Sequence, residues 1–376
     1  MKDEYYFRTE GLTVGYDGVP LIKDIEIGIR RGEILTLIGP NGAGKTTILK
    51  SIIRQLSPIC GVVYLDGRKM QEMNGKEIAT RMSVVLTERV KPELMSCEDV
   101  VATGRYPYTG TFGLLSDQDR RIVKESMELV HITELSDRDF TRISDGQKQR
   151  VMLARAICQE PDMIVLDEPT SFLDIKYKLE FLSIIQKMAR SRNLSVIMSL
   201  HELDLAGRIS DQMVCVRGDK IDRCGTPEEI FTKGYIPKLY GMTVGSYDEL
   251  SGNLELEKVS GEPKVLILSG NGTGTSLFRR LQREGIPFAA GILMENDLDY
   301  PSAKALASEV ISVRAFAPIR EAEQKRAMEL VEQCEKVIFT LPEDHFSQMG
   351  EYGRILEKLL TFAKETGKYC EASAAF

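Results

Sequence analysis

One eight-residue segment near the N-terminus limits the possible folds of this chain more than any other feature. It reads Gly39-Pro40-Asn41-Gly42-Ala43-Gly44-Lys45-Thr46. The apolar segment before it, EILTLI, favours a strand, and the segment after it, TTILKSII, favours a helix. A glycine-rich turn of this spacing between a strand and a helix is typical of a phosphate-binding loop. We therefore expect an α/β core that binds a nucleotide, with a chance glycine-rich turn as the less favoured alternative.

Each residue type in this segment has a physical reason to be there. Glycines allow the backbone N–H groups to turn inward around a phosphate, and a helix N-terminus favours negative charge. Lys45 would supply a positive charge to the β- and γ-phosphate oxygens, and the Thr46 hydroxyl would bind Mg²⁺. The segment therefore predicts binding of a nucleoside triphosphate together with a magnesium ion.

A second motif ends an apolar strand with two carboxylates. The residues MIVLDE, 163 to 168, are continuously apolar until Asp167 and Glu168. Such runs are typical of a buried parallel strand, which delivers its last residues to the carboxyl edge of a sheet. Asp167 suits Mg²⁺ held through water, and Glu168 suits the attacking water. The alternative, an acidic cap of the next helix, is less favoured beside a phosphate-binding loop.

Length, charge and cysteine content exclude several classes of protein. The 376 residues suit two domains. A net charge of -7 argues against nucleic acid as a partner, because phosphate neutralisation needs clustered Lys and Arg. Seven scattered cysteines without Cys-x-x-Cys spacing disfavour a disulfide framework and a zinc site. Without an apolar leader or a run of 18 apolar residues, we expect neither a signal peptide nor a membrane span.

The apolar pattern predicts a mainly parallel sheet covered by helices. Alternating segments between residues 5 and 38 favour strands, and helical spacing covers 117–130, 146–159 and 175–190. After a polar linker, 243–262, with a possible hairpin, the β-α alternation resumes. We therefore expect one domain at 1–242 and a second, smaller Rossmann-like α/β domain at 263–376.

A third segment, Ile143-Ser144-Asp145-Gly146-Gln147-Lys148-Gln149-Arg150, precedes a predicted helix. With the two motifs above, residues 5 to 242 resemble the ATP-binding cassette family of transport ATPases. The matching features follow the family's order: Tyr16, the phosphate-binding loop, the segment around Glu88, this signature, Asp167-Glu168, Ser171-Phe172-Leu173-Asp174 and His201. The resemblance implies a P-loop NTPase cassette with a RecA-like core, an antiparallel β subdomain and a helical subdomain.

The family's mechanism implies an ATPase that uses ATP and Mg²⁺ in a head-to-tail homodimer. Each ATP would lie between the loop of one subunit and the signature of the other. The residues this assigns to catalysis are Lys45, Glu168 and His201. Those assigned to Mg²⁺ are Thr46, Glu88 and Asp167. Those assigned to the nucleotide are Tyr16, Gly39, Pro40, Asn41, Gly42, Ala43, Gly44, Lys45, Thr46, Thr47, Ser144, Gly146, Gln147 and Asp174.

Three residues depart from the family's usual pattern. Ile143 replaces a leucine of equal volume. Asp145 replaces a glycine, and a favourable helix cap explains it better than a catalytic role. Glu88 stands where a glutamine is usual, unless a shift by one residue places Thr87 there. His201 follows a predicted strand, LSVIMSL, where a core histidine is the alternative to a γ-phosphate contact.

The segment from Leu94 to Thr109 resembles cassettes that energise importers of siderophores, haem and cobalamin, especially at Gly104-Arg105-Tyr106-Pro107-Tyr108. This implies a permease and an extracytoplasmic substrate-binding protein as partners, and a peripheral position at the cytoplasmic face of the membrane. The alternative for the tyrosines is simple packing of the subdomain. An exporter cassette and a soluble, non-transport ATPase of the same family are the alternative functions.

The second domain has a glycine-rich turn of its own. Gly270-Asn271-Gly272-Thr273-Gly274-Thr275 follows an apolar strand and opens a predicted helix. It could hold a phosphate or a carboxylate on its N–H groups, or it could be a tight structural turn. The turn lacks a lysine, and no strand of this domain ends in paired carboxylates. We therefore expect a regulatory or ligand-sensing module and not a second catalytic unit.

Overall fold

The structure is a computed structural model that describes residues 4–86, 92, 94–110 and 113–371. The chain divides into two compact units, Met1–Tyr240 and Gly241–Phe376. Each unit contains its own buried apolar clusters, one formed by residues between 6 and 216 and two formed by residues beyond 264. Each unit therefore has its own hydrophobic core and is described by itself.

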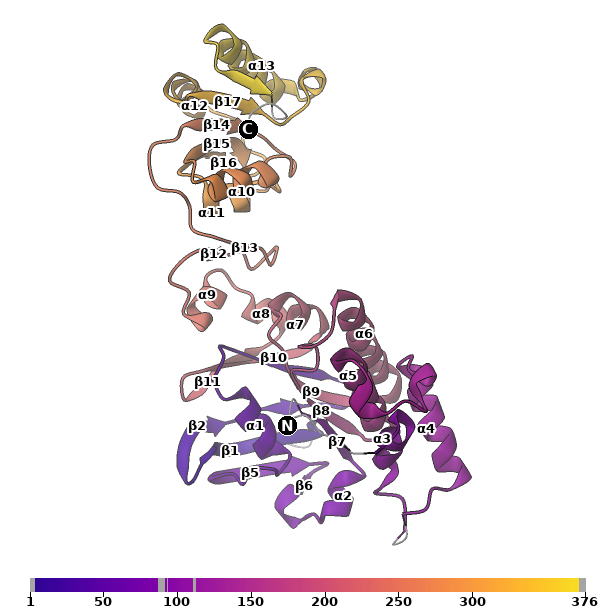
Figure 1. The fold of residues 1–376 in the computed structure, drawn as a ribbon. Helices are drawn as coiled ribbons and strands as arrows, with labels where there is room; N and C mark the ends of the chain where they lie inside the picture. The colour runs from indigo at the N-terminus through magenta and orange to yellow at the C-terminus, as the bar shows by residue number, and fades with distance from the viewer. Residues whose placement is uncertain (1–3, 87–91, 93, 111–112, 372–376) are drawn as a thin grey trace. The chain divides into compact units, whose positions relative to one another are not determined.

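A six-stranded sheet forms the centre of the first unit, in the order β11-β10-β4-β9-β8-β7 (Figure 1). The strands are β4 (Ile34–Ile38), β7 (Met82–Val85), β8 (Met163–Asp167), β9 (Ser195–Ser199), β10 (Gln212–Arg217) and β11 (Lys220–Gly225). All neighbours pair in parallel except β10 and β11. Every residue of β4, β8 and β9 is buried, which confirms the predicted mainly parallel, covered sheet.

An antiparallel sheet packs beside it and forms the predicted β subdomain. Its strands are β1 (Phe7–Tyr16), β2 (Val19–Ile25), β3 (Gly28–Ile29), β5 (Cys60–Leu65) and β6 (Arg68–Lys69). Phe7 and Leu12 of β1 share one apolar cluster with Leu35 of β4 and Ile48 of α1 (Lys45–Ile52). The two sheets therefore enclose α1, the helix that follows the phosphate-binding loop.

Serine caps set the starts of the helical subdomain. Ser96, Ser116 and Ser144 each accept the backbone N–H three residues further on, and the side chain at that third position bonds back to the cap. Such reciprocal capping satisfies two helix-end donors at once. The elements of this subdomain are α3 (Cys97–Ala102), η3 (Thr103–Arg105), α4 (Asp117–Leu129), η4 (Thr133–Leu135), η5 (Phe140–Arg142) and α5 (Asp145–Cys158). Two earlier elements, η2 (Met70–Glu72) and α2 (Gly75–Ala79), lie between β6 and β7, and Asn74 caps α2.

The remaining helices of this unit are α6 (Ile175–Arg192), α7 (Leu203–Ile209), α8 (Pro227–Ile230) and α9 (Tyr235–Tyr240). The helices predicted over 117–130, 146–159 and 175–190 are thereby confirmed as α4, α5 and α6.

The second unit contains a five-stranded parallel sheet in the order β16-β15-β14-β17-β18. Its strands are β14 (Val265–Leu268), β15 (Phe288–Met294), β16 (Glu309–Val313), β17 (Lys336–Phe339) and β18 (Tyr369–Glu371). Its helices are α10 (Thr275–Glu284), α11 (Tyr300–Leu306), α12 (Glu321–Gln333), η6 (Glu343–Gln348) and α13 (Gly350–Glu365).

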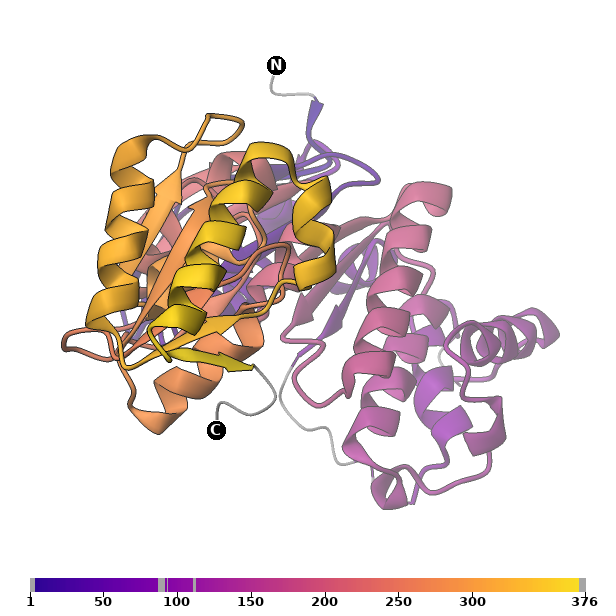
Figure 2. The same cartoon turned by 90° about the horizontal axis from the view of Figure 1, so that it is seen from above.

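Alternate residues of β14 point to opposite faces of this sheet. Val265 and Ile267 share a cluster with apolar residues of α10 and α11, whereas Leu266 and Leu268 join those of α12 and α13. In the view from above, α12 and α13 run side by side along one face of the sheet (Figure 2). The fully apolar sequence of β14 is therefore explained by helices on both faces.

A short hairpin, β12 (Ser246–Tyr247) and β13 (Leu254–Glu255), belongs to the second unit. Glu255 is only 7% exposed, and its carboxylate accepts bonds from Arg279 of α10 at 2.6 Å and from Ser302 of α11 at 2.8 Å. Because a buried carboxylate needs such partners, this ion pair fixes the hairpin to α10 and α11. Only residues 241–245 separate the hairpin from α9.

The glycine turn before α10 is filled by carboxylates of the same unit. Asp299, fully buried, accepts the N–H groups of Gly274 and Thr275, both at 2.8 Å. It also accepts the Thr275 hydroxyl at 2.8 Å. Asp297 accepts the N–H of Asn271 at 2.9 Å. Negative charge at a helix N-terminus is favourable, so these contacts hold the start of α10 in place.

We expect Asp299→Ala to destabilise the second unit by about 2 to 3 kcal/mol, because buried N–H donors lose their acceptor. Urea unfolding, followed by hydrogen exchange of peptides from β14 and β17, would measure this loss. Asp344→Ala, an exposed aspartate of the same unit, is the control and should have little effect. Equal stability of the two variants would contradict the capping role of Asp299.

Candidate functional site

Three neighbouring parallel strands bring the sequence-predicted residues to one edge of the sheet. β4 pairs with β9, and β9 pairs with β8, all in the same direction. The loops that leave their carboxyl ends begin at Gly39, Leu200 and Glu168. Because the carboxyl ends of parallel strands lie at the same edge, segments far apart in the sequence meet there.

The phosphate-binding loop depends on glycine at its first position and before its helix. Gly39 has φ +146°, and a Cβ there would lie 2.3 Å from the carbonyl oxygen of Val216. Gly44 has φ +95°, and its Cβ would lie 2.5 Å from Cδ1 of Ile22. The contact with the Val216 backbone leaves no room for a side chain at Gly39, and the positive φ of Gly44 favours glycine there as well. The turn therefore brings its backbone as close to the neighbouring strands as the fold allows.

Lys45 lies buried at the start of α1. Its Nζ donates to the carbonyl oxygens of Gly39, at 2.8 Å, and Pro40, at 3.1 Å. Burial lowers the pKa of Lys45, and the neighbouring carboxylates of Glu168 and Asp167 oppose that shift. A positive charge is thus held in the loop, beside two negative ones, with few groups to solvate it.

Thr46 and Asp167 form an oxygen-rich pair. The Thr46 hydroxyl lies 3.0 Å from Oδ2 and 3.2 Å from Oδ1 of Asp167, and the hydroxyl of Ser199 donates to Oδ1 at 2.7 Å. A hydroxyl and a carboxylate are the hard oxygen ligands that suit Mg²⁺. Among the described residues, no group of three or more His, Cys, Asp or Glu could hold a metal. These two side chains therefore fit as oxygen ligands of a Mg²⁺ ion.

Glu168 lies directly after β8 with a positive φ of 49°. Its Oε1 is 2.5 Å from Nε2 of His201, and the hydroxyl of Ser171 donates to its Oε2 at 3.3 Å. Its backbone N–H donates to the Ser199 hydroxyl at 2.9 Å. The structure thus brings together two of the three residues assigned to catalysis, and orients the carboxylate from both of its oxygens.

Tyr16 ends β1 and is half exposed. Its hydroxyl lies 3.2 Å from the hydroxyl of Thr47, in the first turn of α1. The aromatic ring is therefore placed next to the helix that follows the phosphate-binding loop. Glu88, the third residue assigned to Mg²⁺, lies outside the described residues.

The signature residues form the start of α5. Ser144 is the N-cap: its hydroxyl accepts the N–H of Gln147 at 3.3 Å, and the Gln147 side chain accepts the N–H of Ser144 at 3.0 Å. The cap expected of Asp145 is therefore provided by Ser144. Asp145 is the first residue of the helix and lies 3.4 Å from the ammonium of Lys148.

The signature packs beside the segment that follows Glu168. A Cβ on Gly146 would lie 3.5 Å from Leu173 and from the carbonyl oxygen of Phe172. Asp174 is the N-cap of α6 and accepts the N–H of Tyr177 at 3.0 Å. Two helix N-termini, at Ser144 and Asp174, are thus presented by neighbouring segments.

Two polar residues escaped the sequence analysis. Ser199, the last residue of β9, bridges Asp167 and Glu168 through the bonds described above. Glu202 joins the loops after β8 and β9: it accepts the Thr170 hydroxyl at 3.0 Å and pairs with Lys178 at 2.5 Å. These links with Lys178 and Thr170 lower the pKa of Glu202 although its burial acts to raise it. The only sequence feature that could have indicated Ser199 is its place as a polar residue at the end of the apolar strand β9.

The segment around Arg105 contains one buried, ion-paired residue and one highly exposed residue. Arg105 is 4% exposed and pairs with Asp119 and Glu160, each at 2.8 Å, while the ring of Tyr108 covers its guanidinium at 4.1 Å. Tyr106, in contrast, is 79% exposed. Tyr108, although 41% exposed, packs on Arg105 as the simple-packing alternative expects, whereas that alternative leaves Tyr106 unexplained.

The glycine turn of the second unit lies where the strand order reverses, between β14 and β17. Ligands commonly bind at such points. Here, however, the N–H groups of Asn271, Gly274 and Thr275 already bind Asp297 and Asp299. A bound phosphate would have to displace these carboxylates and would meet their negative charge. The structure therefore favours the structural-turn alternative at this position.

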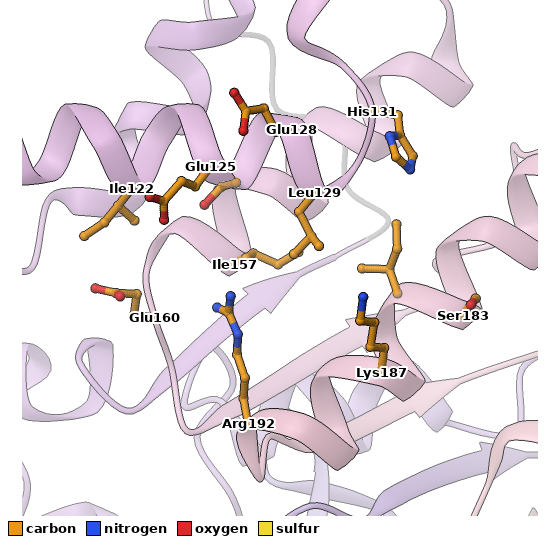
Figure 3. Close-up of a pocket in the computed structure, with 12 residues that line it drawn as sticks. Ile122, Glu125, Glu128, Leu129, His131, Ile157, Glu160, Ser183, Lys187 and Arg192 are labelled. Carbon is orange, nitrogen blue, oxygen red and sulfur yellow. The ribbon is translucent and has the colours of Figure 1, made fainter.

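A cavity of about 690 Å³ lies between α4 and α6 of the first unit. Carboxylates of α4 line one part of it, and Lys187 and Arg192 of α6 line another (Figure 3). None of the residues assigned to ATP or Mg²⁺ contributes to its lining. The candidate ATP site is thus defined by the sheet edge and not by this cavity.

The family models match both units. The ABC transporter model matches residues 22–171, and the MJ0874 family model matches residues 288–369. Among solved structures, a dimeric ATP-binding cassette in a post-hydrolysis state, bound to ADP and Pi, has a TM-score of 0.53 and 23% identity. That match covers 59% of this chain and 98% of the other, and it concerns the fold.

Three curated relatives are similar in sequence. An uncharacterised ABC transporter ATP-binding protein of Methanocaldococcus jannaschii is 42% identical over 76% of this chain and 99% of its own. The iron(3+)-hydroxamate import ATP-binding protein of Bacillus subtilis is 35% identical over 62% of this chain and 86% of its own length. The cobalamin import ATP-binding protein of Halobacterium salinarum is 28% identical over 83% of this chain and 79% of its own length.

No helix in the described ranges is both long and apolar enough to cross a bilayer. The sheet-edge site, the family model and the relative that aligns with 42% identity over 99% of its length agree with one another. This chain belongs to the ATP-binding subunits of the ABC transporter family.

Proposed function

We propose that this chain hydrolyses ATP to drive uptake of an iron chelate, haem or cobalamin through a separate membrane permease. The observation that carries the proposal is the meeting of Lys45, Asp167 and Glu168 at one sheet edge, within a chain similar to iron-hydroxamate and cobalamin import subunits. The subunit would act at the cytoplasmic face of the membrane, with permease subunits and an extracytoplasmic substrate-binding protein as partners.

The chain's residues divide the work of hydrolysis. The loop N–H groups and the Lys45 ammonium bind the phosphates, and Tyr16 stacks on the adenine. Thr46 and Asp167 would hold Mg²⁺, which would neutralise phosphate charge. Glu168 orients the attacking water and accepts its proton, and His201, in contact with Glu168, stabilises the γ-phosphate as its charge changes. Ser171 and Ser199 hold Glu168 at its side chain and backbone.

A homodimer would complete each site. The signature N-terminus at Ser144, with Gly146 and Gln147, would bind the γ-phosphate of the partner's ATP, because a helix N-terminus favours anions. Asp174 would connect the two sites across the dimer. The exposed apolar residues beside it, Phe172 at 46% and Ile175 at 79%, suit burial between two copies. The dimeric ADP-bound cassette of the same fold supports this arrangement.

Tyr106 would contact the permease. It stands exposed beside the buried Arg105 ion-pair network, which gives it a rigid base on the helical subdomain. An exposed tyrosine on a rigid base is a typical anchor of a protein interface. Force generated at the sheet edge would reach the permease through this subdomain.

The second unit would regulate transport. Its glycine turn binds its own carboxylates, it lacks the lysine of a phosphate-binding loop, and its core is separate from that of the cassette. A sensor needs only different affinities for two states of the transporter. A coupling of about 1 to 3 kcal/mol would change transport several-fold to a hundredfold.

We expect Glu168→Gln to bind ATP normally, to accumulate as an ATP-bound dimer and to hydrolyse ATP roughly 10² to 10⁴ times more slowly, because the base is lost while the shape stays. Steady-state ATPase and gel filtration with ATP would measure both effects. Glu125→Gln, an exposed glutamate of α4, is the control. Turnover near that of the wild type would show that Glu168 is not the base.

We expect Tyr106→Ala to reduce uptake of a labelled iron chelate by about tenfold or more in vesicles that contain the cognate permease, because interface anchors dominate binding energy. Basal ATPase of the isolated chain should stay unchanged. Tyr106→Phe keeps the ring and should retain most uptake. Equal uptake by Tyr106→Ala and wild type would place the permease contact elsewhere.

A chain that ends at residue 245 should still bind and hydrolyse ATP, because the cassette core is complete without the second unit. Permease-coupled transport should differ from that of the full chain over a panel of nucleotides and corrinoids. Loss of ATPase activity on truncation would contradict the independence of the cassette. Chemical conversion of any of these compounds by the second unit would replace the sensor by an enzyme.

A further inference from the structure

The first residue of the phosphate-binding loop is held by a helix at the end of the cassette. The N–H of Gly39 donates to the hydroxyl of Tyr240 at 3.2 Å, across 201 positions of sequence. Its carbonyl oxygen accepts the Lys45 ammonium at 2.8 Å. Both polar groups of Gly39 are therefore tied, one to the lysine of the loop and one to α9.

Packing leaves Gly39 little freedom besides these two bonds. A Cβ at this position would lie 2.3 Å from the carbonyl oxygen of Val216 in β10. The backbone thus passes close to β10 just where the loop leaves β4. At this close approach, the Tyr240 hydroxyl accepts the N–H of the residue at which the chain enters the loop.

The helix that carries Tyr240 is itself anchored. Ile236 and Leu239 are buried, at 1% exposure each. The Tyr235 hydroxyl donates to Asp222 of β11 at 2.9 Å, and the guanidinium of Arg223 covers its ring at 3.8 Å. Since β11 pairs with β10, α9 is fixed to the same sheet that carries the loop. Tyr240 therefore holds a definite position relative to Gly39.

Tyr240 is also the last residue of the first unit. Residues 241–245 follow, and then the β12–β13 hairpin, which the Glu255–Arg279 ion pair fixes to the second unit. Only five residues thus separate the contact on Gly39 from a segment that is fixed to the second unit.

We propose that Tyr240 is a positioning residue for the phosphate-binding loop, and that the second unit influences nucleotide affinity through it. The hydroxyl keeps the Gly39 peptide group in the orientation that receives the phosphates. A pull on residues 241–245 weakens this bond, and bound ATP strengthens it in return, because such coupling is reciprocal. The inference rests on the proposed regulatory function of the second unit.

The test uses the full chain with Tyr240→Phe, which removes one hydroxyl and keeps the ring. We expect the Kd for ATP and for ADP, measured by calorimetry, to rise roughly two- to tenfold, the effect of one lost hydrogen bond. The kcat at saturating ATP should change by less than about twofold, because the loop is restored once the nucleotide binds. Tyr64→Phe, which removes the hydroxyl that bonds Glu10 in the β subdomain, is the matched control.

Hydrogen exchange supplies a readout that a general loss of stability would not produce. In Tyr240→Phe, peptides that contain Gly39 should exchange faster while those of β14 stay unchanged. In the wild type, ATP should slow exchange in residues 241–256, and the substitution should abolish this response. Nucleotide affinity and exchange equal to those of Tyr64→Phe would overturn the proposal.

The outcomes of these measurements distinguish a failure of the coupling from a failure of the ATPase function. A wild-type chain that binds ATP while residues 241–256 fail to respond would refute the coupling to the second unit. Affinity loss without that response would leave Tyr240 as a positioning residue of the cassette alone. A wild-type chain that neither binds nor hydrolyses ATP would instead refute the ATPase function.

Discussion

The site of this protein depends on the parallel pairing of β4 with β9 and of β9 with β8. This pairing brings a lysine, two carboxylates and a histidine to one sheet edge. Burial makes such a concentration of charge costly unless each group has a partner. Ser199 bonds to Asp167 and to the backbone of Glu168, and His201 contacts the Glu168 side chain. The same contacts that stabilise the edge also orient the groups that would act on ATP.

Both units contain a glycine-rich turn between a strand and a helix, but different charged residues accompany the two turns. In the cassette, the glycine turn is followed by Lys45, and Gly39 approaches the backbone of β10 so closely that no side chain fits there. In the second unit, the Asp299 carboxylate lies at the start of α10 and accepts the N–H groups of Gly274 and Thr275. The difference is electrostatic: a lysine favours an incoming anion, whereas a carboxylate already bound to the N–H groups disfavours one. A glycine-rich turn between strand and helix therefore does not by itself indicate a phosphate site.

Helix N-termini and exposed side chains mark the surfaces through which this subunit would work with others. Ser144 and Asp174 complete their own helix caps, so their contribution across a dimer would come mainly from N–H groups and helix dipoles. Arg105 is buried and ion-paired, whereas Tyr106 is exposed. Buried ion pairs thus supply rigidity, and exposed aromatic and apolar residues would supply the contacts with partner subunits.

The sequence by itself determined the class of fold, the glycine-rich loop, the carboxylate pair and the positions of α4, α5 and α6 to within two residues, because glycine spacing and apolar periodicity are local properties. Glu88 lies outside the described residues, so its assignment to Mg²⁺ stays a prediction. Only the tertiary structure decided that Ser199 links Asp167 to Glu168, that Asp299 occupies the second glycine turn, and that Tyr240 holds Gly39. Each of these contacts joins residues 25 to 201 positions apart. The order of strands in a sheet decides such contacts, and no local pattern encodes that order.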